Sequence, residues 1–151
     1  MSLKETITAE VKNAMRAKDS ARLGTLRFLQ AAIKQKEVDD RRELSDAEVI
    51  AIIEKQIKQR KESVAAYEQA GRAETAEQEK AEIAVLQEFL PKAADPAEIE
   101  AAIAAAIEAA AAAGAQGPAM MGKVMATLKQ SLAGRADMSQ VSQLVKAKLS
   151  S

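Results

Sequence analysis

The sequence predicts an all-α protein made of two helical domains. Aromatic residues make up 2% of the 151 residues and Trp is absent, so a core must be built from Ala, Leu, Ile, Val and Met. Residues of high helix propensity (Ala, Glu, Lys and Gln) are abundant, and strand formers are few. Apolar residues recur at helical spacing along the chain, and no segment is a strand candidate.

The first two expected helices are marked by two apolar stripes: Leu3, Ile7, Val11 and Met15, then Leu23, Leu26, Leu29 and Ile33. The second helix ends in the charged run EVDDRRE. Gly24 lies inside it, where glycine costs about 1 kcal/mol relative to alanine. We interpret Gly24 as a point of close contact with another helix.

Two further helices complete an amino-terminal domain, residues 1–92. Ser45 and Glu48 form a capping box that opens the third helix, which stops at Gly71. Thr75 and Gln78 form a second capping box. It starts a linker helix, about residues 75–90, that ends before a proline.

The segment LPKAADP, residues 90–96, is the predicted boundary because it holds two prolines five residues apart. Asp95 followed by Pro96 is a strong helix start, since a cap is followed by a first-turn proline. The fifth helix is rich in Ala, and we expect it to pack through one narrow apolar stripe: Ile99, Ile103 and Ile107. It ends at Gly114.

Two last helices complete a three-helix carboxy-terminal domain, residues 95–151. They run from about 119 to 132 and from about 139 to 149, and the turn Gly134-Arg135-Ala136 joins them. In the last helix the wheel assigns three residues to the core: Val141, Leu144 and Val145. Lys148 falls near this apolar face, where a long side chain can reach back to solvent.

The stretch GPAMMGKV, residues 117–124, has most of the Gly and Lys spacing of a nucleotide-binding P-loop. A P-loop needs a preceding strand, free backbone N–H groups, and Ser or Thr after its lysine. Here an Ala-rich helix precedes, position 118 is a proline, and Val124 follows Lys123. We therefore expect no nucleotide site.

The helical wheel offers another use for these residues. The core side of the sixth helix carries five apolar residues: Met121, Val124, Met125, Leu128 and Leu132. The opposite flank carries the basic and small residues: Gly122, Lys123, Ala126, Lys129 and Gln130. Two small residues one turn apart between two lysines allow a polyanion backbone to approach closely. On the last helix Lys146 looks outward, and Arg135 precedes it in the turn.

This flank has two interpretations: an ordinary solvated face, or a surface for a nucleic-acid backbone. In the second case phosphate and shape would be recognised rather than bases, because no aromatic side chain is available for stacking. Net charge is zero, so bulk attraction to nucleic acid, DNA included, is not expected. The charge is uneven, however: residues 1–42 hold 10 bases and 6 acids, and residues 115–151 hold 5 bases and one acid.

Composition argues against several kinds of catalysis. Cys and His are absent, so there is no thiolate nucleophile and no histidine base or ligand. Glu79 and Glu82 lie on one helix face, and we interpret them as partners in interhelical salt bridges. Asp39 and Asp40, expected in a loop, are too few to argue a metal site. We predict no catalytic residue, no cofactor and no metal.

The chain is expected to be cytoplasmic. Glu5 and Glu10 occur where a signal peptide would have its apolar core, and the absence of Cys fits a reducing compartment. The longest charge-free stretch, residues 109–122, is too short to span a membrane.

Residues 121–149, MGKVMATLKQSLAGRADMSQVSQLVKAKL, resemble the carboxy-terminal tail of GatB, the tRNA-handling subunit of bacterial Asp/Glu-tRNA amidotransferase. The segments TLRFLQAAIKQKE, LSDAEVIAIIEKQIKQRKESVAAYEQAGR and EKAEIAVLQEFLP resemble the rest of the stand-alone YqeY family. The resemblance implies a helical amino-terminal domain, a partly helical linker and a three-helix carboxy-terminal domain.

The GatB tail binds the outer corner of tRNA, and the likeness implies the same for the Gly122-Lys123 helix, Arg135 and Lys146. Ala126 and Met138 stand where relatives often have Gly, which changes either how closely a backbone can approach or the form of the turn. The catalytic parts of the amidotransferase are absent. The family's label of carbon–nitrogen ligase activity with glutamine as amide donor is therefore interpreted as inherited from GatB.

Two hypotheses follow. The first is a non-catalytic tRNA-binding module, accessory to a glutamine-dependent tRNA amidotransferase or another translation-related protein. Its expected contact residues are Gly122, Lys123, Lys129, Arg135 and Lys146. The second is a helical protein-interaction adaptor without RNA binding. A steep salt dependence of tRNA binding is expected only from the first.

Overall fold

The computed structural model describes residues 2–150. These residues form seven α-helices and no strand, so the predicted all-α class is confirmed. The helices are α1 (Leu3–Ala17), α2 (Ser20–Asp40), α3 (Asp46–Gln69), α4 (Ala73–Gln87), α5 (Pro96–Ala112), α6 (Pro118–Ser131) and α7 (Met138–Ser150). None of them, within the described residues, combines the length and apolar character needed to cross a bilayer.

Contacts divide the chain into two compact units between Leu90 and Pro91. This division falls inside the predicted boundary segment, residues 90–96. That residues 1–92 and 95–151 fold independently stays a prediction.

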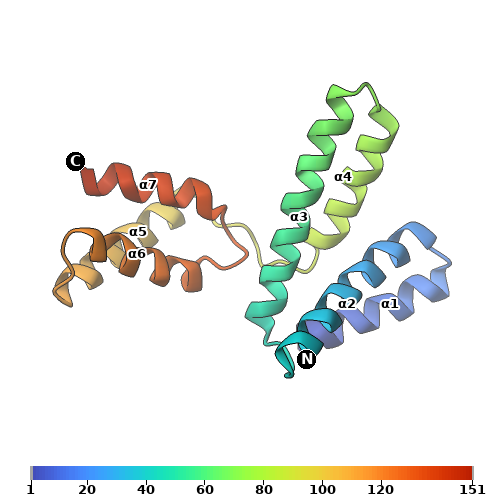
Figure 1. Ribbon diagram of the computed structural model, residues 1–151, viewed down its shortest axis with the longest axis horizontal. Coiled ribbons are helices and arrows are strands. Elements are labelled where there is room, and N and C mark those ends of the chain that lie inside the picture. Colours follow the sequence, from blue (N-terminus) through green and yellow to red (C-terminus); the bar gives the residue numbers. More distant parts are fainter. Residues whose placement is uncertain (1, 151) are drawn as a thin grey trace. The chain divides into compact units, whose positions relative to one another are not determined.

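The amino-terminal unit consists of two helical hairpins, α1–α2 and α3–α4, which meet mainly through α2. Its core is aliphatic, as the composition requires, and its most deeply buried residues are Ile7, Leu26, Leu29, Val49, Ile53 and Leu86. In Figure 1 the end of the α3–α4 hairpin near the α3–α4 turn extends beyond α1 and α2. That end is therefore supported chiefly by contacts between α3 and α4.

The helix starts follow local chemistry in two of the three predicted cases. The Ser45–Glu48 capping box is formed, and the Asp95 side chain accepts a hydrogen bond from the Glu98 N–H, with Pro96 in the first turn. The predicted capping box at Thr75 is wrong, because α4 already begins at Ala73. Gly71, at φ 74°, turns the chain directly into α4, which has no side-chain cap.

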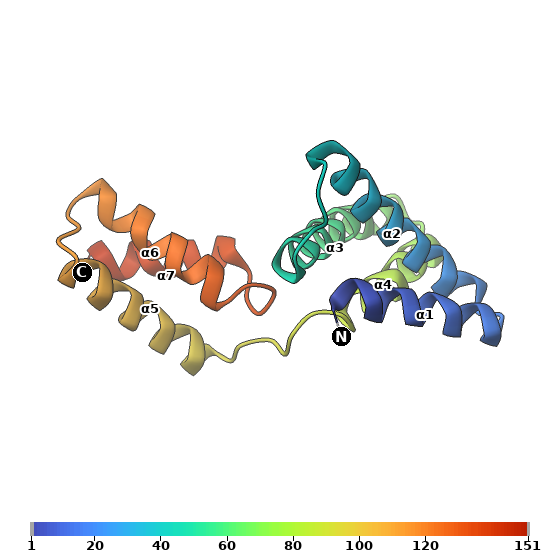
Figure 2. The ribbon, with the colours of Figure 1, turned by 90° about the horizontal axis from the view of Figure 1, so that it is seen from below.

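The carboxy-terminal unit is built around α6, which packs on both α5 and α7. In Figure 2 α5 lies beside α6, and α7 is seen behind α6. The buried residues of α5 are one isoleucine and two alanines, Ile103, Ala106 and Ala110. The other alanines of α5 are exposed or only partly buried. Helix α5 therefore packs through one narrow stripe, but the predicted composition of that stripe is only partly right: Ile99 and Ile107 are partly buried, and Ala106 and Ala110 join Ile103 in the core.

Candidate nucleic-acid interface

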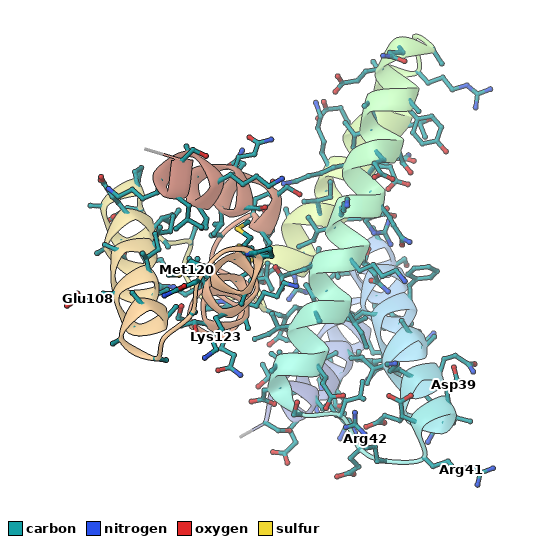
Figure 3. All side chains as sticks on the ribbon, turned by 60° about the vertical axis from the view of Figure 1, so that its left-hand side comes forward. Asp39, Arg41, Arg42, Glu108, Met120 and Lys123 are labelled. Carbon is teal, nitrogen blue, oxygen red and sulfur yellow. The ribbon has the colours of Figure 1, made fainter. Side chains whose placement is uncertain are left out.

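Helix α6 has the predicted core on one side and the predicted contact residues on the other. Val124 and Leu128 are fully buried. The residues of the opposite flank are all exposed: Gly122, Lys123, Ala126, Lys129 and Gln130. Figure 3 labels Lys123, which is exposed, and Met120, which packs against the core of this unit. The basic, small-residue flank is thus a real solvent-facing surface.

No contact within the described structure requires glycine at position 122. It lies within α6, and a Cβ built there has no heavy atom within 4 Å. Glycine inside a helix costs about 0.5–1 kcal/mol relative to alanine, so the fold would be more stable without it. Gly24 in α2 has the same open surroundings. The interpretation of Gly24 as a close helix contact is therefore wrong, because no atom of another helix lies within 4 Å of a Cβ built there.

Within residues 2–150, the three lysines predicted to contact RNA, Lys123 and Lys129 of α6 and Lys146 of α7, make no ion pair with a carboxylate. Several bases of the amino-terminal unit differ in this respect, because each pairs with acids: Lys4, Arg22, Arg42, Arg60 and Lys80. Lys146 is exposed on α7, so the three charges come from two neighbouring helices.

The side chain and backbone of Arg135 make hydrogen bonds within the carboxy-terminal unit. Its Nε donates to the carbonyl oxygen of Lys92 at 2.9 Å, and its Nη2 lies 2.5 Å from a carboxylate oxygen of Glu98. The carbonyl of Arg135 also accepts from the Ala94 N–H at 2.8 Å. The residue thus fastens the segment before α5 to the turn between α6 and α7. These partners are 37 or more residues away in sequence, so local sequence patterns give no sign of them.

The carboxylates of α4 are ion-pair partners, as predicted. Arg60 of α3 pairs with Glu79 at 3.2 Å and also with Glu82, and its guanidinium lies 5.5 Å from the ring centre of Phe28. Burial raises the pKa of Glu82, although Arg60 acts in the opposite direction and Glu79 adds to the rise. The cluster joins α2, α3 and α4, and a hollow of about 310 Å³ lies beside Glu82.

Asp39 and Asp40 are the last two residues of α2 rather than part of a loop, so that expectation is wrong. The helix continues until Arg41, whose left-handed backbone (φ 55°) ends it. Asp39 accepts from Gln35, and Asp40 pairs with Lys36. Figure 3 labels Asp39, Arg41 and Arg42 at this turn. In the part of the chain that the structure describes, no group of three or more acids could hold a metal ion.

With this geometry established, comparison with known proteins identifies the relatives. The family model described as Yqey-like protein matches residues 4–149. The chain belongs to the YqeY-like family. The resemblance drawn from the sequence is therefore confirmed for the family, and the match includes all of α6 and the turn that holds Arg135.

Three fungal relatives carry the name "Altered inheritance of mitochondria protein 41, mitochondrial". The protein of Pyrenophora tritici-repentis is 31% identical over 130 residues, covering 86% of this chain and 71% of that protein. That of Lachancea thermotolerans is 34% identical over 98 residues, covering 63% and 52%. That of Kluyveromyces lactis is 35% identical over 81 residues, covering 53% and 44%. The matches thus span about half the length of the last two relatives.

These names contradict the expectation of a cytoplasmic protein, because the relatives are described as mitochondrial. That expectation rested on two early glutamates and the lack of Cys. They do not distinguish the cytoplasm from the interior of an organelle.

Proposed function

We propose that the carboxy-terminal unit binds the sugar–phosphate backbone of a structured RNA, with tRNA as the foremost candidate. The observation that carries the proposal is the exposed flank of α6, where Gly122 and Ala126 lie between two lysines without ion pairs. A helix surface without large side chains lets a backbone come close, while Lys123 and Lys129 supply charge to its phosphates. The likeness of this stretch to the GatB tail supports the same assignment.

Recognition would rest on shape and phosphate rather than base identity. The carboxy-terminal unit has no aromatic side chain on which an unpaired base could stack. Structured RNA offers a wide minor groove lined by 2′-hydroxyls and phosphates. The exposed amide of Gln130 can donate to or accept from such a hydroxyl.

Arg135 has a structural role in addition to the contact inferred from the sequence. Its Nε and Nη2 donate to Lys92 and Glu98, and the other N–H groups of the guanidinium are left for a phosphate. We therefore rest the charge test on Lys123, Lys129 and Lys146, because changing Arg135 would also remove the contacts that hold the segment before α5.

The test is tRNA binding across a range of salt concentrations. Each phosphate contact contributes roughly 0.7–0.9 to the slope of log affinity against log salt. Changing Lys123, Lys129 and Lys146 to Gln should therefore remove about 2–3 units of slope. A matched control changes three exposed lysines of the other unit, Lys12, Lys55 and Lys58, and so alters net charge equally.

Equal loss in both triple variants would show non-specific attraction and refute the proposed surface. A parent protein that binds tRNA without salt dependence, or not at all, would favour an adaptor without RNA binding. Gly122→Leu tests shape separately, because it blocks close approach and leaves every charge in place. Gly24→Leu is its control, since that glycine is equally open but lies on α2.

We further propose that this protein takes part in amide transfer only as an accessory binding protein and not as the enzyme. The chain has no Cys or His to act as nucleophile or base. Purified protein given glutamate-charged tRNA, glutamine and ATP should make no glutaminyl-tRNA. Sustained amide transfer under these conditions would contradict this assignment.

A further inference from the structure

A groove of about 590 Å³ runs between α5 and α7 in the carboxy-terminal unit. Its lining is mostly apolar, with one charged residue from each helix. The lining residues are Pro96, Ile99, Glu100 and Ile103 of α5, and Gln140, Leu144, Ala147 and Lys148 of α7. The groove exists because α5 and α7 both pack on α6 but make little contact with each other.

Leu144 is an apolar residue that the rest of the carboxy-terminal unit leaves half exposed. Its helical position predicts a core residue, next to the buried Val141 and Val145, yet Leu144 is 51% exposed. The assignment of Leu144 to the core is therefore wrong for the chain alone. The apolar stripe of α7 is wider than the surface that α6 covers, and Leu144 lines the groove instead.

The two walls of the groove carry opposite charge. Helix α5 contains three glutamates and no base, whereas α7 contains two lysines and no acid. Glu100 and Lys148 bring these charges to the groove itself. An RNA backbone entering here would face Glu100, so the groove does not suit the ligand proposed for α6.

We propose that this groove binds an amphipathic α-helix of a partner protein, with an apolar stripe on Ile99, Ile103 and Leu144. The two flanks of this partner helix carry opposite charge: Lys or Arg lies beside Glu100, and Asp or Glu lies beside Lys148. The lining residues of α7 run from Gln140 to Lys148, about 13 Å at 1.5 Å per residue, so two to three turns of helix fill the groove. Such a helix supplies the contact that α5 and α7 do not make with each other.

The experiment uses the full chain and three synthetic helical peptides of about 18 residues that share one Leu stripe. One has Lys on one flank and Glu on the other, the second has Lys on both, and the third has Glu on both. The parent should prefer the mixed peptide. Glu100→Lys makes both walls basic and should shift the preference to the Glu peptide. Lys148→Glu makes both walls acidic and should shift it to the Lys peptide.

The apolar contact is tested with Leu144. Leu144→Glu and Leu144→Ala should each weaken binding of the mixed peptide, the former by about tenfold or more, because the apolar contact between Leu144 and the peptide is lost. Val38→Glu is the control, since Val38 is an apolar residue of the other unit that is 59% exposed. Helix content checks folding, and tRNA binding of the Leu144 variants should match the parent.

Either of two results overturns the proposal. One is undiminished peptide binding by both Leu144 variants. The other is a peptide preference that does not follow the charge changes at Glu100 and Lys148. Neither result bears on the tRNA experiment, which uses other residues.

Discussion

Replacing Arg135 with Gln should expose the segment that precedes α5 to proteolysis. The guanidinium holds the carbonyl of Lys92, and that carbonyl belongs to the bond that a lysine-specific protease would cut. In the variant this hydrogen bond and the ion pair with Glu98 are lost. The hydrogen bond from the Ala94 N–H to the Arg135 carbonyl remains, because it uses only backbone atoms.

The size of the effect follows from these two contacts. A hydrogen bond to a charged donor contributes about 1.5–3 kcal/mol when well shielded. The Arg135 side chain is 31% exposed, so we take the contribution as about 1 kcal/mol. The Glu98 side chain is 47% exposed, and its ion pair adds about 0.5 kcal/mol or less. The total of about 1.5 kcal/mol corresponds to roughly tenfold more of the open segment.

The assay is native-state cleavage after Lys92, followed by mass spectrometry. When opening and closing are fast, the cleavage rate follows the population of the open form. Arg135→Gln should therefore be cut about tenfold faster than the parent. Glu98→Gln keeps the bond to Lys92 and should be cut no more than about twofold faster. Equal rates for the parent and Arg135→Gln would refute the reasoning, because the Lys92 carbonyl would then not be protected by Arg135.

Two further predictions concern stability. Gly24→Ala and Gly122→Ala should each stabilise their helix by about 0.5–1 kcal/mol in urea unfolding, since a Cβ at either site meets open space. A loss of stability would mean that one of these positions is covered in solution. Arg42, and secondarily the Ser45 N–H, hold the pKa of Glu48 down at about 2. Because the pKa of Glu48 is lower in the folded than in the unfolded protein, the ionised carboxylate stabilises the fold at pH values above the unfolded-state pKa. This stabilisation is lost as the pH falls toward 2. Urea unfolding at several pH values should therefore show less loss of stability between pH 5 and 2.5 in Glu48→Gln than in the parent. Parallel curves would contradict this.

The parts of the fold that sequence predicted well depend on nearby residues. The capping box at Ser45 and the Asp95-Pro96 start involve atoms within three residues of each other, and both are present. The helical wheel of α6 placed Val124 and Leu128 inside and Lys123 outside for the same reason. The predicted capping box at Thr75 is wrong because another local feature, the turn at Gly71, comes first and α4 begins at Ala73.

The errors concern which neighbour, if any, covers a given helix face. A wheel shows that Leu144 belongs to an apolar stripe, but it does not show how much of that stripe α6 covers. Gly24 likewise is a small residue of the kind found where two helices approach closely, but a Cβ built there has no heavy atom within 4 Å. For the candidate site, sequence predicted the exposed flank with Lys123 and Lys129. It could not predict that Arg135 would bind residues far away along the chain.

The projecting end of the α3–α4 hairpin determines what spectroscopy can report. Tyr67 is the single tyrosine of a chain without Trp, and it lies in the last turn of α3, next to that end. Residues 91–151 contain no aromatic side chain. Intrinsic fluorescence therefore follows fraying of one hairpin, while circular dichroism sums the helices of both units. An early fluorescence transition would mark local opening and say nothing about the surface of α6.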